Sequence, residues 1–109
     1  MKYQIIYSET AKNDLKKLYR YISDELCEPQ IAAGQVKSIM NGIQGLDEMP
    51  FRHKLYYDEP WHSQGLRSFL VNKHLVFYFA DEASGTVKIV RIIYGGRDIK
   101  TLLSKTDLG

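Results

Sequence analysis

Hydrophobic side chains in the first half of the chain recur at the spacing of an amphipathic helix. One stripe has alternating gaps of four and three, and it consists of Ala11, Leu15, Leu18, Ile22 and Leu26. Ser8 stands where an N-cap is expected, and Glu9 favours the positive end of the helix dipole. A second stripe follows Pro29, which suits a first helical turn, and it consists of Ala32, Val36, Ile39, Ile43 and Leu46. The two stripes predict a pair of antiparallel helices that ends near Leu46.

Runs rich in β-branched and aromatic residues, which are typical of strands, begin the chain and dominate its second half. Residues 2–7 form one such run, and three more lie within residues 65–99, with the sequences GLRSFLV, HLVFYFA and VKIVRIIY. Residues 51–64 are irregular and aromatic, so we expect an ordered crossing segment there. Asp98 can cap a short final helix over residues 99–103. The order predicts an α+β fold with an N-terminal strand, a helical hairpin, an antiparallel three-strand meander and a short C-terminal helix.

The first two strands of the meander can be aligned if Asn72 and Lys73 form a two-residue turn. Val71 then faces His74, and Arg67 faces Tyr78. Since side chains alternate along a strand, one face carries Arg67, Phe69, Val71, His74, Val76 and Tyr78. The other face carries Leu66, Ser68, Leu70, Leu75, Phe77 and Phe79. The second set is more apolar, so we expect it to pack on the helices and the first set to form an exposed polar face.

Composition places the chain among ordinary folded proteins. Its 109 residues, 44% hydrophobic and 26% charged, fit one small domain spanning residues 1–109. Cys27 is the only cysteine, which excludes an internal disulfide and favours the cytoplasm. No stretch approaches the roughly 20 apolar residues of a membrane helix, so no membrane partner is expected. A net charge of +2 permits contact with nucleic acid or an acidic partner without demanding either.

Motifs for cofactors and metals are missing from the sequence. It has no GxGxxG, P-loop or HExxH, and its three histidines lack ligand-like spacing, so we expect no cofactor and no metal. Arginine, histidine and tyrosine on the polar sheet face suit a phosphate-rich target. His74 is the only plausible general base on that face. Arg91 interrupts an apolar strand, where it either has a structural role, snorkelling at an edge or pairing with an acid, or joins the polar face.

Three segments together resemble the RelE/ParE superfamily of bacterial toxin–antitoxin systems. They are SETAKNDLKKLYRYI near the start, GLRSFLVNKHLVFYFADE in the middle and RIIYGGRDI near the end, and they span almost the whole chain. The resemblance implies a type II toxin that a small cognate antitoxin holds inactive in a hetero-oligomer. It also implies one of two targets. RelE-like members cut messenger RNA in the ribosomal decoding site, and ParE-like members poison DNA gyrase.

The resemblance also points to candidate residues. Arg97 matches the basic residue that follows the last strand of the family, while Arg67 and His74 lie on strands where the ribonucleases place basic residues. Arg52 and Lys54 precede the meander, as the ribonucleases' lysines do. The candidate catalytic set of a RelE-like enzyme is therefore Arg67, His74 and Arg97. The candidate target-binding set is Arg52, Lys54, Tyr78, Arg91, Tyr94 and Arg97.

Two departures from the ribonuclease pattern favour a ParE-like gyrase poison. No tyrosine follows Tyr94, and a net charge of +2 is low for a protein that enters a ribosomal RNA site. A RelE-like endoribonuclease is the first alternative, and a superfamily member that only binds its antitoxin is the second. On either toxin interpretation, Arg97→Ala is expected to relieve growth inhibition. We expect an amphipathic antitoxin segment to lie along the helical hairpin or along the polar sheet face.

Overall fold

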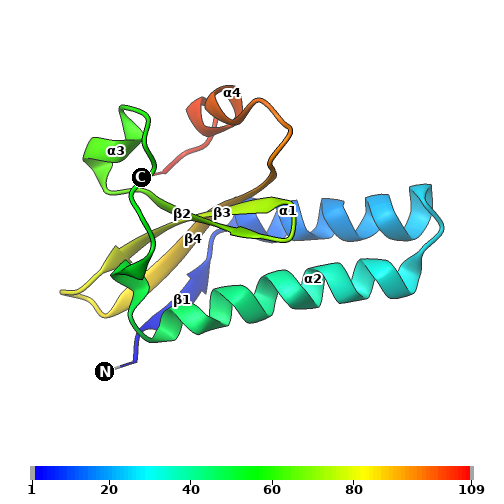
Figure 1. The fold of residues 1–109 in the computed structure, drawn as a ribbon, viewed down its shortest axis with the longest axis horizontal. Coiled ribbons are helices and arrows are strands. Elements are labelled where there is room, and N and C mark those ends of the chain that lie inside the picture. The colour runs from blue at the N-terminus through cyan, green and yellow to red at the C-terminus, as the bar shows by residue number, and fades with distance from the viewer. Residues whose placement is uncertain (1, 109) are drawn as a thin grey trace.

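The chain forms a four-stranded sheet with a long helical hairpin on one face and two short helices on the other (Figure 1). The computed structural model describes residues 2–108. The strands are β1 (Gln4–Tyr7), β2 (Arg67–Val71), β3 (His74–Asp81) and β4 (Thr86–Tyr94), and the helices are α1 (Glu9–Arg20), α2 (Pro29–Gln44), α3 (Trp61–Gln64) and α4 (Ile99–Ser104). Their order in the sheet is β1-β4-β3-β2, with β1 parallel to β4 and the other pairs antiparallel. The predicted α+β fold is confirmed.

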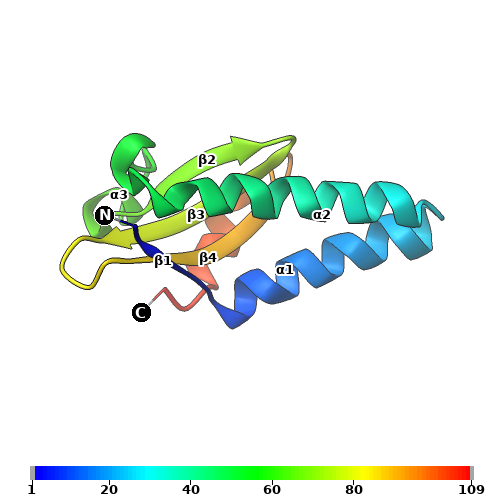
Figure 2. The same ribbon diagram turned by 90° about the horizontal axis from the view of Figure 1, so that it is seen from below.

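The helical hairpin begins and breaks where the sequence predicts. Ser8 caps α1 by accepting a hydrogen bond from the backbone N–H of Ala11 at 3.1 Å. Beyond Arg20 the helix continues through a π-helical turn, Tyr21–Glu25, and α2 starts at Pro29. Figure 2 shows that α1 and α2 extend past the ends of the strands. The tip of the hairpin therefore has no sheet beneath it, and Leu26 at that tip is 52% exposed although it continues the apolar stripe.

The predicted register between β2 and β3 is confirmed in every pair. Val71 lies opposite His74, and Arg67 lies opposite Tyr78. Asn72 makes the tight turn possible because it adopts the left-handed conformation, with φ 55°. Asparagine tolerates that conformation better than most residues with a side chain. The register places His74 and Arg67 at opposite ends of the β2–β3 pair.

The predicted assignment of the two sheet faces is wrong. Val76 and Tyr78 are fully buried on the face that the helical hairpin covers, among Ile39 and Ile43 of α2. The opposite face is covered as well, because Trp61 of α3 and Leu103 of α4 pack there in a second cluster: Tyr56, Trp61, Leu66, Phe77, Val90, Ile93 and Leu103. The number of apolar residues on each sheet face does not show which face packs on the helical hairpin. The more apolar face is buried instead by the crossing segment and the C-terminal helix.

Strand β4 is central for part of its length only. β1 pairs with β4 as far as Tyr7, which lies opposite Ile89. The pairing of β3 with β4 shifts register at this level, so that Tyr78 faces Ile89 and Phe77 faces Arg91. Such a bulge turns the following side chains out of strict alternation. Past Ile89 the free edge of β4 is therefore open to α1, and Arg91 points toward it.

Candidate functional site: a cleft between the helical hairpin and the sheet

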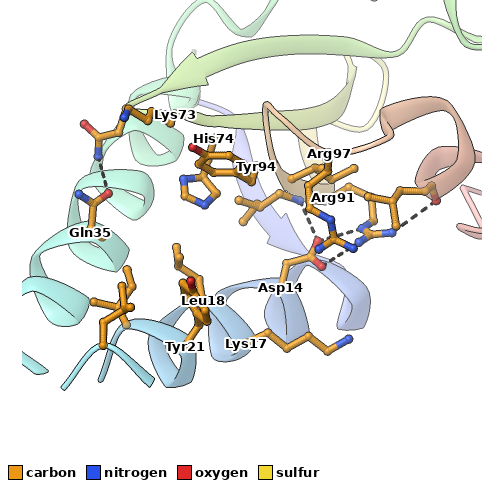
Figure 3. A pocket seen from close by; sticks show the side chains of 16 residues that line it. Asp14, Lys17, Leu18, Tyr21, Gln35, Lys73, His74, Arg91, Tyr94 and Arg97 are labelled. Atoms are coloured by element: carbon orange, nitrogen blue, oxygen red, sulfur yellow. Dashed lines mark hydrogen bonds and ion pairs between the residues drawn. The ribbon is translucent and has the colours of Figure 1, made fainter. Parts of the chain in front are cut away.

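A cleft of about 1090 Å³ lies where the hairpin projects past the sheet (Figure 3). Leu18, Tyr21, Ile22 and Leu26 line it from the hairpin, and Ile92 and Tyr94 line it from β4. Tyr21 is 56% exposed and Tyr94 is 46% exposed, so the aromatic and aliphatic lining is open to a partner. An apolar groove of this kind suits the apolar face of an amphipathic peptide segment.

Cations border the apolar lining. Lys17 of α1, Lys73 of the β2–β3 turn and Arg97 after β4 line the cleft, and all three are exposed. None of the three forms an ion pair with another residue in the described range 2–108. Asp14 is the acid that lines the cleft, and its charge is already matched by Arg91. The cleft therefore complements a segment with acidic side chains beside its apolar ones.

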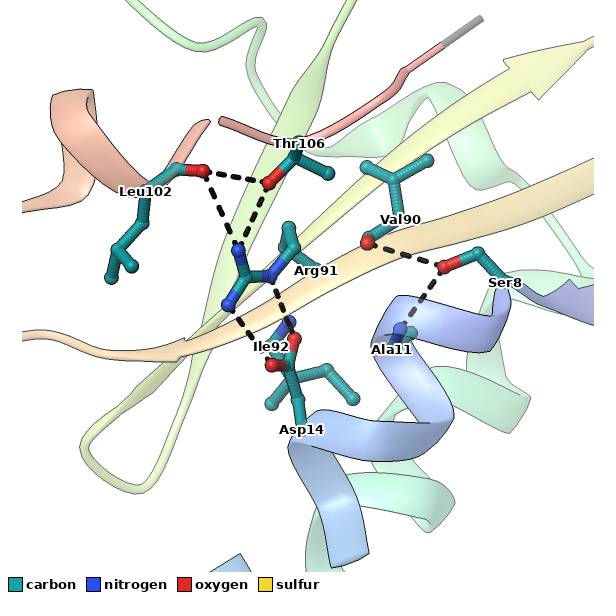
Figure 4. A network of polar contacts seen from close by, with 8 residues as sticks. All are labelled: Ser8, Ala11, Asp14, Val90, Arg91, Ile92, Leu102 and Thr106. Atoms are coloured by element: carbon teal, nitrogen blue, oxygen red, sulfur yellow. Dashed lines mark hydrogen bonds and ion pairs between the residues drawn. The ribbon is translucent and has the colours of Figure 1, made fainter. Parts of the chain in front are cut away.

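Asp14 and Arg91 form the polar network that closes one side of the cleft (Figure 4). The Asp14 carboxylate accepts hydrogen bonds from Arg91 Nε at 2.9 Å, from Arg91 Nη2 at 3.0 Å and from the Ile92 N–H at 2.8 Å. Arg91 Nη1 donates to Thr106 Oγ1 at 2.9 Å, which ties the segment after α4 to the sheet. Of the roles that the sequence left open for Arg91, the structure shows the structural one of pairing with an acid.

His74 lies at the sheet side of the cleft and is half-buried. It contacts Tyr94 edge to face, with ring centroids 5.5 Å apart, and its Nδ1 is buried without a hydrogen-bond partner among the described residues. Desolvation lowers the pKa of His74, because burial penalises the charged imidazolium. Among residues 2–108 no carboxylate hydrogen-bonds to this ring, so the arrangement that usually prepares a histidine for proton transfer is not seen there.

The burial of His74 predicts a loss of stability in acid. The unfolded chain takes up the His74 proton as the pH falls below the ordinary pKa of 6.5, whereas the folded chain resists it. The free energy of unfolding should therefore fall as the pH drops below 6.5, and urea titrations at several pH values would measure this. His74→Gln should make that fall shallower. His53, whose pKa is also lowered by desolvation and by Arg52, supplies a residual slope. Parallel profiles for the two proteins would contradict the prediction.

Arg67 does not share the cleft with His74 and Arg97. It lies four residues from Val71 along β2, which is about 13 Å at the rise of a strand. Its guanidinium is engaged by backbone carbonyl groups of the same protein. Nη1 donates to the carbonyl oxygen of His53 at 2.6 Å and to that of Phe51 at 3.3 Å. The guanidinium also lies 5.1 Å from the centre of the Phe51 ring. The three candidate catalytic residues are therefore split, with two at the cleft and one at the far end of β2.

The candidate target-binding residues fall into the same two groups. Arg91, Tyr94 and Arg97 line the cleft, whereas Arg52 and Lys54 are exposed in the segment beside Arg67. Tyr78 belongs to neither surface. It is fully buried, and its hydroxyl donates to the Pro50 carbonyl oxygen at 2.6 Å. The prediction that Tyr78 contacts a target is wrong for this structure, because its side chain fills the core under the helices.

The Tyr78 hydroxyl is expected to stabilise the segment that contains Pro50. Burial raises the pKa of Tyr78 to about 12, so the hydroxyl keeps its proton and remains a donor at neutral pH. Tyr78→Phe leaves the Pro50 carbonyl without this partner in a buried place, which should cost about 1–3 kcal/mol of unfolding free energy. Chemical denaturation would measure the loss. A change below about 0.3 kcal/mol would mean that water replaces the hydroxyl.

Several cleft residues were not found by sequence reasoning. Lys17 and Tyr21 belong to neither candidate set, and Lys73 enters the prediction only as a turn residue. Leu18 enters only as part of the apolar stripe of the first helix. The available signal was the apolar stripe that continues to Leu26, since a stripe longer than the sheet beneath it leaves an uncovered end.

The fold is that of the RelE/ParE toxins. A solved structure of a chromosomal ParDE system from P. aeruginosa superposes with a TM-score of 0.69 at 18% identity, covering 84% of this chain and 95% of that one. The RelBE2 toxin–antitoxin complex from Mycobacterium tuberculosis gives 0.60 at 25% identity, covering 86% and 99%. A mutant of E. coli toxin RelE in the free state gives 0.66 at 12% identity, covering 97% and 95%. The superfamily resemblance predicted from the sequence is confirmed.

Within that superfamily the chain has a specific assignment. Residues 5–99 match the family of the ParE toxin of the type II toxin–antitoxin system parDE, and the chain belongs to that family. No match is found among the curated proteins. The protein is thus a toxin of a type II toxin–antitoxin system, and an antitoxin is its partner. Within residues 2–108, no helix has the length and apolar character needed to cross a membrane.

Proposed function

We propose that this toxin inhibits bacterial growth from the cytoplasm by poisoning DNA gyrase, and that its antitoxin neutralises it by binding in the cleft. The observation that carries the choice of target is the separation of Arg67 from His74 and Arg97. The predicted catalytic set needs His74 to take the ribose 2′-hydroxyl proton while Arg67 and Arg97 both reach the adjacent phosphate group. Arg67 is held on the carbonyl oxygens of Phe51 and His53, at the other end of β2 from His74.

The proposed antitoxin site rests on the chemistry of the cleft. Its lining is apolar over the hairpin tip. Lys17, Lys73 and Arg97, which form no ion pair within residues 2–108, supply positive charge beside that lining. An amphipathic segment with acidic residues would bury both its apolar face and its charges against partners. The helical hairpin packs on the sheet face that carries Val76 and Tyr78, which argues against the alternative position along that face.

A ribosome-dependent endoribonuclease is the second candidate. The observation in its favour is that His74 and Arg97 line the same cleft, so a histidine and a cation could meet one RNA phosphate without Arg67. The lowered pKa of His74 keeps the ring neutral at pH 7 and therefore able to accept a proton.

Two measurements made together test the choice. The toxin is expressed briefly in cells while messenger RNA ends are mapped, and purified toxin is titrated into a gyrase supercoiling reaction. Inhibited supercoiling with intact messages is the expected result. Cuts in phase with codons, with supercoiling unaffected, would assign the ribonuclease activity instead. A folded protein that causes neither effect and no growth defect would leave only antitoxin binding as its function.

A further inference from the structure

The segment formed by residues 49–54, here called the 49–54 loop, exposes two large apolar side chains. Met49 is 73% exposed and Phe51 is 42% exposed. Met49 also adopts the left-handed conformation, with φ 52° and ψ 53°, directly before Pro50. That conformation is costly for a residue with a side chain, and glycine or asparagine would make the same turn more easily. The backbone at Met49 is therefore strained while its side chain is exposed. Strained residues with exposed side chains often belong to functional sites.

The interior holds the 49–54 loop in one conformation. The buried Tyr78 hydroxyl bonds to the Pro50 carbonyl at 2.6 Å, and Arg67 bonds to the carbonyls of Phe51 and His53. The His53 ring stacks on Phe69 with centroids 4.5 Å apart and planes 12° apart. A surface fixed in this way loses little conformational entropy on binding, which favours affinity.

Charge at the loop selects the kind of partner. Arg52 and Lys54 are exposed, and neither forms an ion pair with another residue that the structure describes. One carboxylate, Glu48, precedes them, so the local positive charge is small. Binding to nucleic acid draws on many phosphate contacts, which two cations cannot supply. The exposed methionine and phenylalanine lie beside the charged groups of one arginine and one lysine. This combination fits a protein surface that has an apolar pocket bordered by carboxylates.

We propose that the 49–54 loop is the surface through which the toxin docks on its target protein, with Met49 and Phe51 entering an apolar pocket and Arg52 and Lys54 meeting carboxylates around it. The inference rests on the proposed function, which makes that target DNA gyrase. The loop lies at the end of β2 away from the cleft, since its anchors Arg67 and Tyr78 are paired at that end. The toxin thus has one surface for its target and another for its antitoxin.

Met49→Gly tests the docking surface without threatening the fold, because glycine adopts the left-handed conformation freely. Purified gyrase is titrated with each toxin, and supercoiling is measured. We expect Met49→Gly to need at least ~10-fold more toxin for half-inhibition, as for an interface anchor. Leu70→Ala is the matched control: Leu70 is 63% exposed on β2, near the turn at Asn72, and its removal should leave inhibition unchanged. Thermal unfolding of each variant confirms that it is folded.

Charge reversal gives a second arm. Arg52→Glu combined with Lys54→Glu should weaken inhibition by a similar factor and reduce its dependence on salt. If the native toxin inhibits gyrase and Met49→Gly inhibits equally well, the docking surface is overturned while the proposed function stands. If the native toxin does not inhibit gyrase, both the proposed function and the proposed docking surface are overturned. Binding of a labelled DNA or RNA duplex by the native toxin alone, lost in the Arg52 and Lys54 variant, would overturn a protein partner in favour of nucleic acid.

Discussion

Replacing Asp14 by alanine is expected to lower the free energy of unfolding by about 3 kcal/mol, the largest stability effect among the substitutions considered. The Asp14 carboxylate accepts three hydrogen bonds, two from Arg91 and one from the Ile92 N–H. Both side chains of the ion pair are largely buried, with 9% of Asp14 and 14% of Arg91 exposed. Alanine would leave the buried guanidinium without its counter-charge and the Ile92 N–H without its acceptor, and that uncompensated burial causes the loss.

Chemical denaturation of the native protein and the variant would measure this difference. Lys12→Ala is the control, because it removes an exposed ion pair with Glu9 on the same helix and should change stability by less than about 0.5 kcal/mol. Asp14→Ala combined with Arg91→Leu should recover part of the loss, since the stranded charge is then gone. A loss below about 1 kcal/mol for Asp14→Ala alone would show that water reaches Arg91 and that the network contributes little.

The Asp14 network illustrates what the sequence could and could not supply. Helix positions followed from the apolar stripes and from Ser8, and the β2–β3 register followed from the turn at Asn72 and Lys73. Those are local signals with a defined period or turn chemistry. The pairing of Asp14 with Arg91 joins residues 77 positions apart, and it depends on β1 ending at Tyr7 so that α1 meets the free edge of β4. No local pattern carries that information.

The wrong assignment of the sheet faces has a related cause. Tyr78 is chemically amphipathic, so a strand pattern cannot tell whether its hydroxyl meets solvent or a buried carbonyl such as that of Pro50. The irregular segment and the C-terminal helix gave no periodic signal, yet Trp61 and Leu103 cover the second face. The family resemblance joined Arg67 to His74 in one candidate site, although the two residues lie at opposite ends of the β2–β3 pair.

Arg97→Ala is expected to weaken antitoxin binding about tenfold while leaving growth inhibition by the free toxin in place. The sequence alone predicts relief of growth inhibition, because it treats Arg97 as a contact to the target. The structure places Arg97 in the cleft with Lys17 and Lys73, while the proposed target surface is the 49–54 loop. The Arg97 side chain is exposed, so its removal should change the unfolding free energy by no more than about 0.5 kcal/mol.

The two expectations for Arg97 are separated by measuring both properties of one variant. Antitoxin affinity is measured by titration calorimetry with the cognate antitoxin, sought in the short reading frame adjacent to that of the toxin. Growth is followed after induction of the toxin alone. Lys105→Ala is the matched control, because Lys105 is an exposed cation that does not line the cleft. Loss of growth inhibition with unchanged antitoxin affinity would show that Arg97 contacts the target, as the sequence predicts. Weakened affinity with full growth inhibition would show that Arg97 contacts the antitoxin and is not needed for action on the target.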